Sequence, residues 1–233
     1  MDFVPAAFIE ALCSNLSFSS VTSLARTSAV AAKVANDYCI NAFSFCLELG
    51  FPDASPDVLY LKDSDCVEAD IAELKPKYCS CMNIVVESKN FDVRDDLLDR
   101  ILAFQRHACT FILQILTPTD EALLDKLTPS RLVLKELDCS TQTRRIIAKP
   151  CLQSIDFMTN HRRRLIGVRN VLKFLEAERV FGKKVILKYS EEEIAEILSS
   201  PTEFEVLSRD PWSTRIRHSR FLIHCGSKVS IEC

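Results

Sequence analysis

Glycine is scarce in this chain, with only 4 among 233 residues. Loops that cradle phosphate groups depend on glycine, because the backbone must approach the ligand closely. Neither G-x-G-x-x-G nor G-x-x-x-x-G-K-[ST] occurs, and the G-x-S-x-G turn of the α/β-hydrolases is also missing. The sequence therefore argues against the common nucleotide-binding and hydrolase folds, and also against flexible glycine-rich linkers.

Long apolar runs and a strong charge of one sign are missing too. No segment approaches the roughly 20 apolar residues that cross a bilayer, and the formal net charge is only −3. The first residues include Asp2 and Glu10 but no basic stretch, so we expect no signal peptide. These features predict a protein of the cytoplasm or nucleus that binds neither nucleic acid nor membrane.

The 11 cysteines are odd in number, and several lie inside apolar runs, among them Cys46, Cys109 and Cys225. Cysteine in such a run behaves as a small hydrophobic residue, so we expect reduced thiols in a reducing compartment. Cys79 and Cys81 form a C-x-C pair, but no second Cys or His pair follows at zinc-site spacing. We therefore predict no metal site and no cofactor.

The titratable residues do not form a catalytic pattern either. Four histidines are scattered along the chain, and His224 and Cys225 share an expected strand, in which neighbouring side chains point to opposite faces. The run of three glutamates at 191–193 stands at an expected helix start, where the helix dipole explains it. The sequence predicts no catalytic residue and a protein that is not an enzyme.

The first fifty residues have the periodicity of helices. Apolar residues recur at intervals of three and four over residues 4–16, with Pro5 in the first turn. A second helical pattern covers residues 21–34. A third covers residues 38–49, and we expect it to end at Gly50 as a helix C-cap.

From about residue 80, short β-branched runs alternate with longer amphipathic segments, and several of these segments begin with a capping residue such as Ser140. The expected strands are MNIVVES, CTFILQIL, RLVLKEL, LQSIDFM, KVILKY and FEVLS. The expected helices are RDDLLDRILAFQRH, TDEALLDKL, STQTRRIIA, LIGVRNVLKFLEAERV and SEEEIAEILSS.

The strands recur about every 20 to 30 residues, which is the spacing of leucine-rich repeats. A doubly wound sheet is the alternative for this alternation, but short helices, even spacing and the missing glycine-rich turn favour a solenoid. Gly226 and Ser227, between the last two alternating runs, predict a β-hairpin that closes the end of the sheet. The predicted fold is α/β: a small helical module, then an irregular βα-repeat solenoid that ends in a hairpin.

Basic residues gather in the later repeats, where acidic residues are few. One interpretation is an ordinary solvated face. The other is a surface that captures an acidic or phosphorylated partner. The residues that we select as possible contacts for such a partner are Arg162, Arg163, Arg164, Lys183 and Lys184, and Arg215, Arg217, His218 and Arg220 follow later in the chain.

The N-terminal stretch resembles an F-box. Val4 and Pro5 stand at the Leu-Pro position that opens this motif, and a first amphipathic helix and a second Leu/Val/Ser-rich helix follow. The family's usual acidic residue is alanine here, its Asp-Leu pair is Ser20-Val21, and the tryptophan near the end of the motif is absent. The positions that match the family's apolar anchors, and that the resemblance implies as adaptor-binding, are Val4, Pro5, Ile9, Leu12, Leu16 and Leu24.

An F-box ahead of irregular leucine-rich-type repeats resembles the divergent F-box proteins of lineage-expanded families. The resemblance implies a substrate-recognition adaptor of an SCF-type ubiquitin ligase, with residues 1–50 as the module that binds the ligase adaptor subunit. Residues 51–233 would then hold an unknown target protein, and the protein would be a monomer outside the complex. Two alternatives remain: a free-standing repeat scaffold whose N-terminal helices only cap the repeats, and a doubly wound enzyme.

Overall fold

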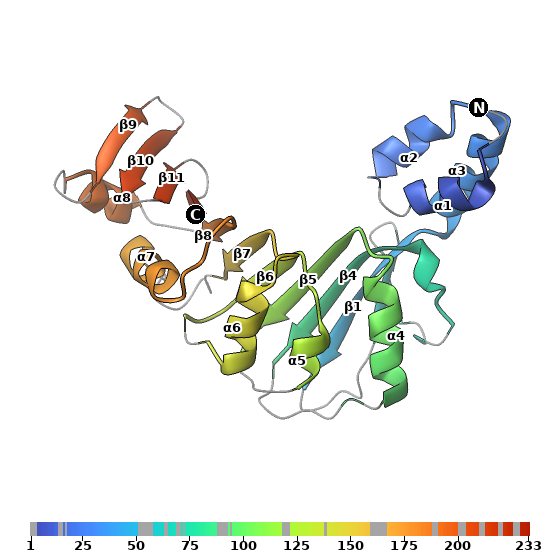
Figure 1. The fold of residues 1–233 in the computed structure, drawn as a ribbon, viewed down its shortest axis with the longest axis horizontal. Helices are drawn as coiled ribbons and strands as arrows, with labels where there is room; N and C mark the ends of the chain where they lie inside the picture. The colour runs from blue at the N-terminus through green and yellow to red at the C-terminus, as the bar shows by residue number, and fades with distance from the viewer. Residues whose placement is uncertain are drawn as a thin grey trace. The chain divides into compact units, whose positions relative to one another are not determined.

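The computed structural model describes residues 4–13, 16, 18–50, 58–62, 65–68, 71, 73–87, 93, 95–117, 122–137, 139–158, 167–187, 191–199, 204–209, 213–218, 221–225 and 229–233. The chain divides into two compact units, Met1–Ile112 and Leu113–Cys233 (Figure 1). Both contain helices and strands, which confirms mixed α/β structure with an open sheet. The predicted helical module of residues 1–50 lies inside the first unit, and its boundary as a domain stays a prediction.

Three helices open the first unit: α1 (Ala6–Cys13), α2 (Phe18–Leu24) and α3 (Ala29–Asn41). α1 begins directly after Pro5, whose carbonyl accepts the Phe8 N–H at 3.0 Å. Proline suits this place, because the N–H that it lacks would have no partner inside the helix. α3 begins at Ser28, whose Oγ accepts the Ala31 N–H at 3.1 Å.

The three helices pack around a small apolar core of their own. Tyr78, which comes from the segment before the fourth strand, packs against this core from outside. The buried residues of the core are Ile9, Cys13, Val21, Ala31, Ala35 and Tyr38, and the partly buried ones include Val4, Leu16, Leu24 and Val34.

The prediction of a third helix over residues 38–49 is wrong. α3 ends at Asn41, and Phe43–Leu49 forms the strand β1, whose residues alternate between buried and half-buried. Phe43, Phe45, Leu47 and Leu49 are the buried set. Gly50 does adopt a left-handed conformation, with φ of 78°, but it follows a strand and not a helix.

The sheet of the first unit has the strand order β3-β2-β1-β4. β1 pairs with β2 (Val58–Lys62) in antiparallel and with β4 (Cys79–Val86) in parallel, and β2 pairs with β3 (Asp65–Glu68) in antiparallel. A short 3-10 helix, η1 (Pro76–Tyr78), leads into β4. α4 (Asp95–Gln105) covers one face of this sheet, because its Phe104 ring lies 4.9 Å from Phe45 and 6.1 Å from Phe43 between centroids. The division between the units falls within β5 (Thr110–Ile115).

The second unit continues with alternating helices and strands. Its helices are α5 (Leu123–Lys126), α6 (Thr141–Ala148), α7 (Val168–Ala177) and α8 (Glu191–Leu198). Its strands are β6 (Arg131–Leu134), β7 (Ser154–Phe157), β8 (Lys184–Leu187), β9 (Glu205–Arg209), β10 (Thr214–His218), β11 (Phe221–Cys225) and β12 (Val229–Glu232).

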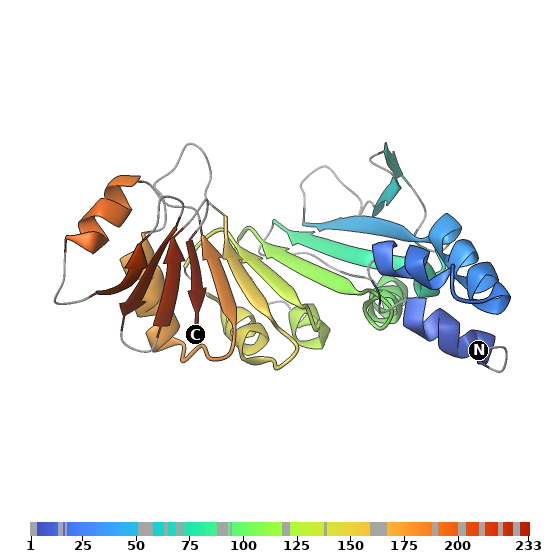
Figure 2. The same cartoon turned by 90° about the horizontal axis from the view of Figure 1, so that it is seen from above.

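The strand order in this unit is β6-β7-β8-β12-β11-β10-β9. β6, β7 and β8 are parallel, as the repeat prediction requires, and α6 and α7 lie on the same side of them (Figures 1 and 2). The Phe157 and Phe174 rings meet edge to face at 5.8 Å, which places α7 against this side of the sheet.

Two sequence predictions about the end of the sheet are wrong. β9, which we expected as the next parallel repeat strand, pairs only with β10 among the described residues, and in antiparallel. The expected hairpin is present, since β11 pairs with β12 in antiparallel, but it does not close the sheet. β12 pairs with β8, and β10 and β9 follow beyond the hairpin.

Basic side chains connect consecutive βα segments. Lys149, at the end of α6, donates from Nζ to the carbonyl of Asp125 at 2.6 Å and also to that of Leu127, in the loop before β6. Lys183, just before β8, donates to the carbonyls of Lys149 at 2.9 Å and Leu152 at 3.0 Å, in the loop before β7. Each lysine thus donates to backbone carbonyls of the preceding βα segment, outside its strand.

Candidate functional site

Both α6 and α7 lie on one side of the second unit's sheet. We call the opposite side of this sheet the open face. Two rows of side chains run across it, because residues that pair directly in neighbouring strands share a face. The first row is Val133, Asp156, Ile186, Ser230, His224 and Arg215. The second row is Arg131, Ser154, Lys184, Glu232, Leu222 and Arg217.

Exposure rises along these rows from β6 towards β10. Val133 and Asp156 are buried, Ile186 and Leu222 are half-buried, and Lys184, Arg215 and Arg217 are exposed. The residues that alternate with them, such as Ile155, Val185 and Ile231, are completely buried on the opposite side of the sheet. The open face is therefore polar and accessible at its β8–β10 end and rests on a packed apolar layer.

Most charges on the open face are already paired. Arg131 of β6 forms an ion pair with Asp156 of β7. The Nε2 atom of His224 lies 3.6 Å from a carboxylate oxygen of Glu232, which is an ion pair when the histidine is protonated. Arg217 lies 3.2 Å from Glu205 of β9. These pairs hold the side chains in place across neighbouring strands.

Lys184 and Arg215 are the exceptions. Neither side chain has a partner among the residues that the structure describes, and both are exposed. They are separated by three strand spacings of about 4.8 Å and by one two-residue step of about 6.7 Å along the strand, which is roughly 16 Å in all. The open face thus presents two cations that no described side chain pairs, at a fixed separation. Ser230, Leu222, His224 and Glu232 lie between their strands, with Glu232 directly opposite Lys184.

The predicted partner-binding residues have different places in the structure. Lys184 is on the open face. Lys183, its neighbour, is not available in the same way, because its ammonium group is used by the carbonyls of Lys149 and Leu152. Lys183 therefore contributes to the contacts between neighbouring loops, and its contact with an acidic partner stays a prediction. Arg162, Arg163 and Arg164 lie outside the described residues.

The residues of the F-box resemblance also separate into two groups. Ile9 is 4% exposed in the core of the three helices, and Val4, Leu16 and Leu24 pack against that core, so Ile9 itself offers no surface to a partner. Pro5 is exposed and Leu12 is half-buried. The adaptor-binding role of the predicted set stays a prediction.

Phe8 belongs to the apolar periodicity of the first helix but is not among the predicted adaptor-binding residues, and it is 56% exposed on α1. Its spacing from Pro5 and Leu12, three and four residues, places the three side chains on one side of the helix. The spacing of Pro5, Phe8 and Leu12 is visible in the sequence, but the periodicity of residues 4–16 is equally consistent with a buried helix face that contains Ile9. The packing of α1 with α2 and α3 decides which of these two helix faces is buried.

Four of the described cysteines, Cys13, Cys79, Cys139 and Cys225, are buried, whereas Cys109 and Cys151 are exposed. Ten described cysteines are free. Burial raises the pKa of the Cys13, Cys79 and Cys109 thiols and raises that of Cys225 to about 11, so these thiols stay protonated near neutral pH. Within the described part of the chain, no three Cys, His, Asp or Glu side chains are arranged to hold a metal ion.

In comparisons with known proteins, no family model, no curated protein and no solved structure matches this chain. None of the helices in the described ranges has the length and apolar character that would let it cross a membrane.

Proposed function

We propose that this protein is a non-catalytic recognition module that binds an acidic segment of another protein on the open face of its second unit. The observation that carries the proposal is the pair of exposed cations, Lys184 and Arg215, which have no partner among the described residues, whereas Arg131 and Arg217 of the same face are in ion pairs. A partner that supplies two carboxylates satisfies both cations without breaking an existing ion pair.

The spacing and the side chains between the two cations specify the partner further. A separation of roughly 16 Å corresponds to about five residues of extended chain, at about 3.3 Å per residue. Leu222, half-buried on β11, offers apolar contact between the two cations, and the half-buried Ile186 lies beside Lys184 on β8. Because only side chains an even number of positions apart share one face of an extended chain, the expected ligand is an extended segment with two acidic residues about four or six positions apart and an apolar residue between them.

A labelled peptide of this design tests the proposal by fluorescence anisotropy. The double variant Lys184→Gln/Arg215→Gln should bind it at least about tenfold more weakly, since each lost contact is a charge-assisted hydrogen bond. The matched control is Lys173→Gln/Arg179→Gln, which removes the same charge from exposed positions in and just after α7 and should bind as the unchanged protein does. Equal weakening in both variants would mean that only overall charge matters and would reject the site.

The same arrangement supports the finer interpretation of the fold as an irregular leucine-rich-type repeat array. Its basis is the parallel order of β6, β7 and β8 with helices on one side, together with the repeated ties made by Lys149 and Lys183. In such an array the strand face is a regular place for partner binding. We expect the protein in the cytoplasm or nucleus, the compartments that its free thiols favour.

A second candidate function concerns the three N-terminal helices, which would attach the protein to the adaptor subunit of an SCF-type ubiquitin ligase. Phe8, exposed on the same side of α1 as Pro5, favours this candidate, because a large exposed apolar side chain is a common anchor in interfaces. Co-purification with the ligase adaptor is the test. Phe8→Asp should abolish it, whereas Ile40→Asp, at a site 65% exposed on α3, should not. Unchanged capture by the Phe8 variant would leave the helices as a cap.

A further inference from the structure

The first unit contains a pocket of about 450 Å³ that the proposed function does not use. Its walls come from α1, from α3, from η1 and from the turn that follows α4. This volume is within the range of about 300–1,000 Å³ that small-molecule sites occupy.

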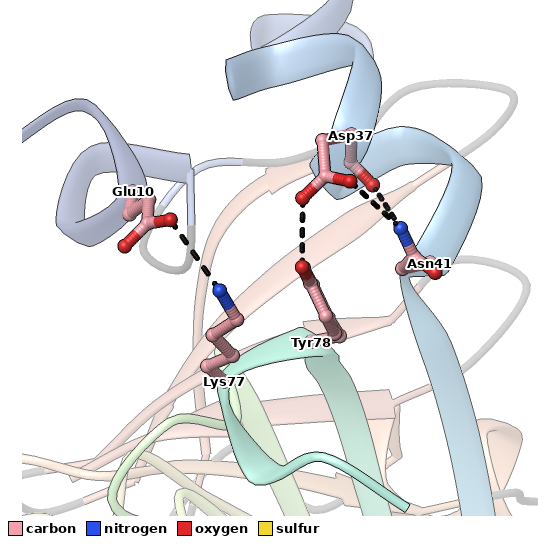
Figure 3. Close-up of polar contacts among 5 residues, drawn as sticks. All are labelled: Glu10, Asp37, Asn41, Lys77 and Tyr78. Atoms are coloured by element: carbon pink, nitrogen blue, oxygen red, sulfur yellow. Dashed lines mark hydrogen bonds and ion pairs between the residues drawn. The ribbon is translucent and has the colours of Figure 1, made fainter. Parts of the chain in front are cut away.

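One wall of the pocket is polar and is held by side-chain contacts between α1, α3 and η1 (Figure 3). The Tyr78 hydroxyl donates to Asp37 Oδ2 at 2.7 Å, and the Asn41 amide donates to Asp37 Oδ1 at 3.1 Å. Lys77 Nζ lies 3.4 Å from Glu10 Oε1 and 4.8 Å from the centre of the Tyr78 ring. Both carboxylates of the pocket are thus already engaged by donors from its own wall.

The rest of the lining is apolar and unusually small. Ala7 and Ala11 stand four residues apart on α1, so they share one side of that helix, and Val34 and the Tyr38 ring face the pocket from α3. Both alanines are exposed. A larger residue at either position would fill the space, so the cavity depends on their small side chains.

The formal charges of the lining cancel, with Glu10 and Asp37 against Lys77 and Arg106, but only Lys77 of the two cations is in an ion pair that the structure describes. Arg106 lines the pocket from the turn after α4, is exposed, and has no partner among the described residues. His107 follows it in the same wall. Since Glu10 and Asp37 are occupied but still carry charge, a ligand with two negative charges would be repelled, whereas one negative charge can be met by Arg106.

We propose that this pocket binds a small organic monocarboxylate, with its carboxylate on Arg106 and its apolar body against Ala7, Ala11, Val34 and Tyr38. The guanidinium fork matches a carboxylate in two parallel hydrogen bonds. The site belongs to the first unit alone and does not depend on the acidic-segment site of the second unit.

Titration of the full chain with phenylacetate, followed by backbone amide resonances, tests the proposal. We expect shifts at Ala7, Ala11 and Arg106 and a Kd on the order of 1 mM, as for other fragment-sized ligands. Phenylacetamide, which is neutral, and phenyl phosphate, which is a dianion, should bind at least about tenfold more weakly. Equal binding of phenylacetamide, or no shift at these residues up to about 10 mM phenylacetate, would overturn the proposal.

Variants separate charge recognition from the shape of the pocket. Arg106→Gln should weaken phenylacetate binding at least about tenfold, and Ala11→Leu should abolish it by filling the cavity while it preserves helix propensity. Arg26→Gln removes the same charge from another exposed position of the first unit and should leave binding unchanged. Full binding by the Arg106 variant would refute the carboxylate contact, and full binding by the Ala11 variant would refute the pocket.

Discussion

Lys183 and Lys184 are adjacent lysines for which the structure predicts opposite consequences. Lys183 donates from its ammonium group to two carbonyls, at 2.9 and 3.0 Å, and is half-buried. Lys184 is exposed on the open face and has no partner in the described part of the second unit. Replacement of each by methionine keeps an unbranched side chain and removes only the charged donor.

The expected cost of Lys183→Met follows from these contacts. A hydrogen bond to a charged group contributes about 1.5–3 kcal/mol, and solvent access at a half-buried site places the total for both bonds near the lower end of that range. We therefore expect a loss of about 2 kcal/mol in the free energy of unfolding, since the carbonyls of Lys149 and Leu152 lose their donor. For a chain of this size, this corresponds to a fall in Tm of about 4–8 °C.

Urea unfolding at pH 7, followed by circular dichroism, measures the difference. Lys183→Met should lower the midpoint at an unchanged slope, and Lys184→Met should stay within about 0.5 kcal/mol of the unchanged protein. Binding of the acidic peptide should respond in the reverse order, with a loss only in the Lys184 variant. If the two variants lose equal stability, or if the Lys183 variant alone loses peptide binding, the assignment of roles is refuted.

Three further outcomes follow from single positions. Phe104→Ala should cost about 3–5 kcal/mol in the free energy of unfolding, measured by urea titration, because the completely buried ring contacts Phe43 and Phe45; a cost under about 1 kcal/mol would contradict that packing. Ser140→Ala should cost about 1 kcal/mol, since its Oγ accepts the Thr143 N–H at 3.2 Å at the start of α6, and Ser140→Asp should restore most of it. Burial raises the pKa of Cys225 from its ordinary value of 9.0 to about 11, so the folded protein keeps a proton that the unfolded chain loses between these two pH values. The free energy of unfolding should therefore fall by about 2 kcal/mol more between pH 9 and pH 11 than it does in Cys225→Val, under reducing conditions; parallel curves for the two proteins would contradict the burial.

Local sequence signals predicted the elements that depend on neighbouring residues. Ser140 caps α6 as expected, and the runs around Val133, Ile155 and Ile186 are strands. In each case the capping residue or the β-branched run is sufficient, because the deciding interactions lie within a few residues. The mixed α/β class followed from these elements together.

Two predictions that depended on distant partners were wrong. Residues 43–49 carry apolar side chains at spacings that fit a helix or a strand, and pairing with β4 some thirty-six positions further along decides for the strand. β9 was expected beside β8, but β12 takes that place. The order of antiparallel strands at the end of a sheet depends on which edges remain free, and no local pattern encodes it.

The candidate site was only partly visible in the sequence for the same reason. Arg215 and Lys184 stand out as basic residues, but the insertion of β12 and β11 between their strands is what aligns them on one face. Lys183 and Lys184 are chemically identical and adjacent. Charge alone therefore cannot show that Lys183 donates to loop carbonyls while Lys184 is exposed on the open face. On α1, Ile9 and Phe8 compete for the core, and contacts with α2 and α3 settle the choice.

The most direct test of the central claim is a map of where the acidic peptide binds, obtained from backbone amide shifts of the full chain during titration. Recognition by the open face predicts shifts at Lys184, Ile186, Leu222 and Arg215, with no change along the exposed side of α7 around Lys173. Shifts confined to α6 and α7, or spread evenly over exposed basic residues, would contradict recognition by the open face.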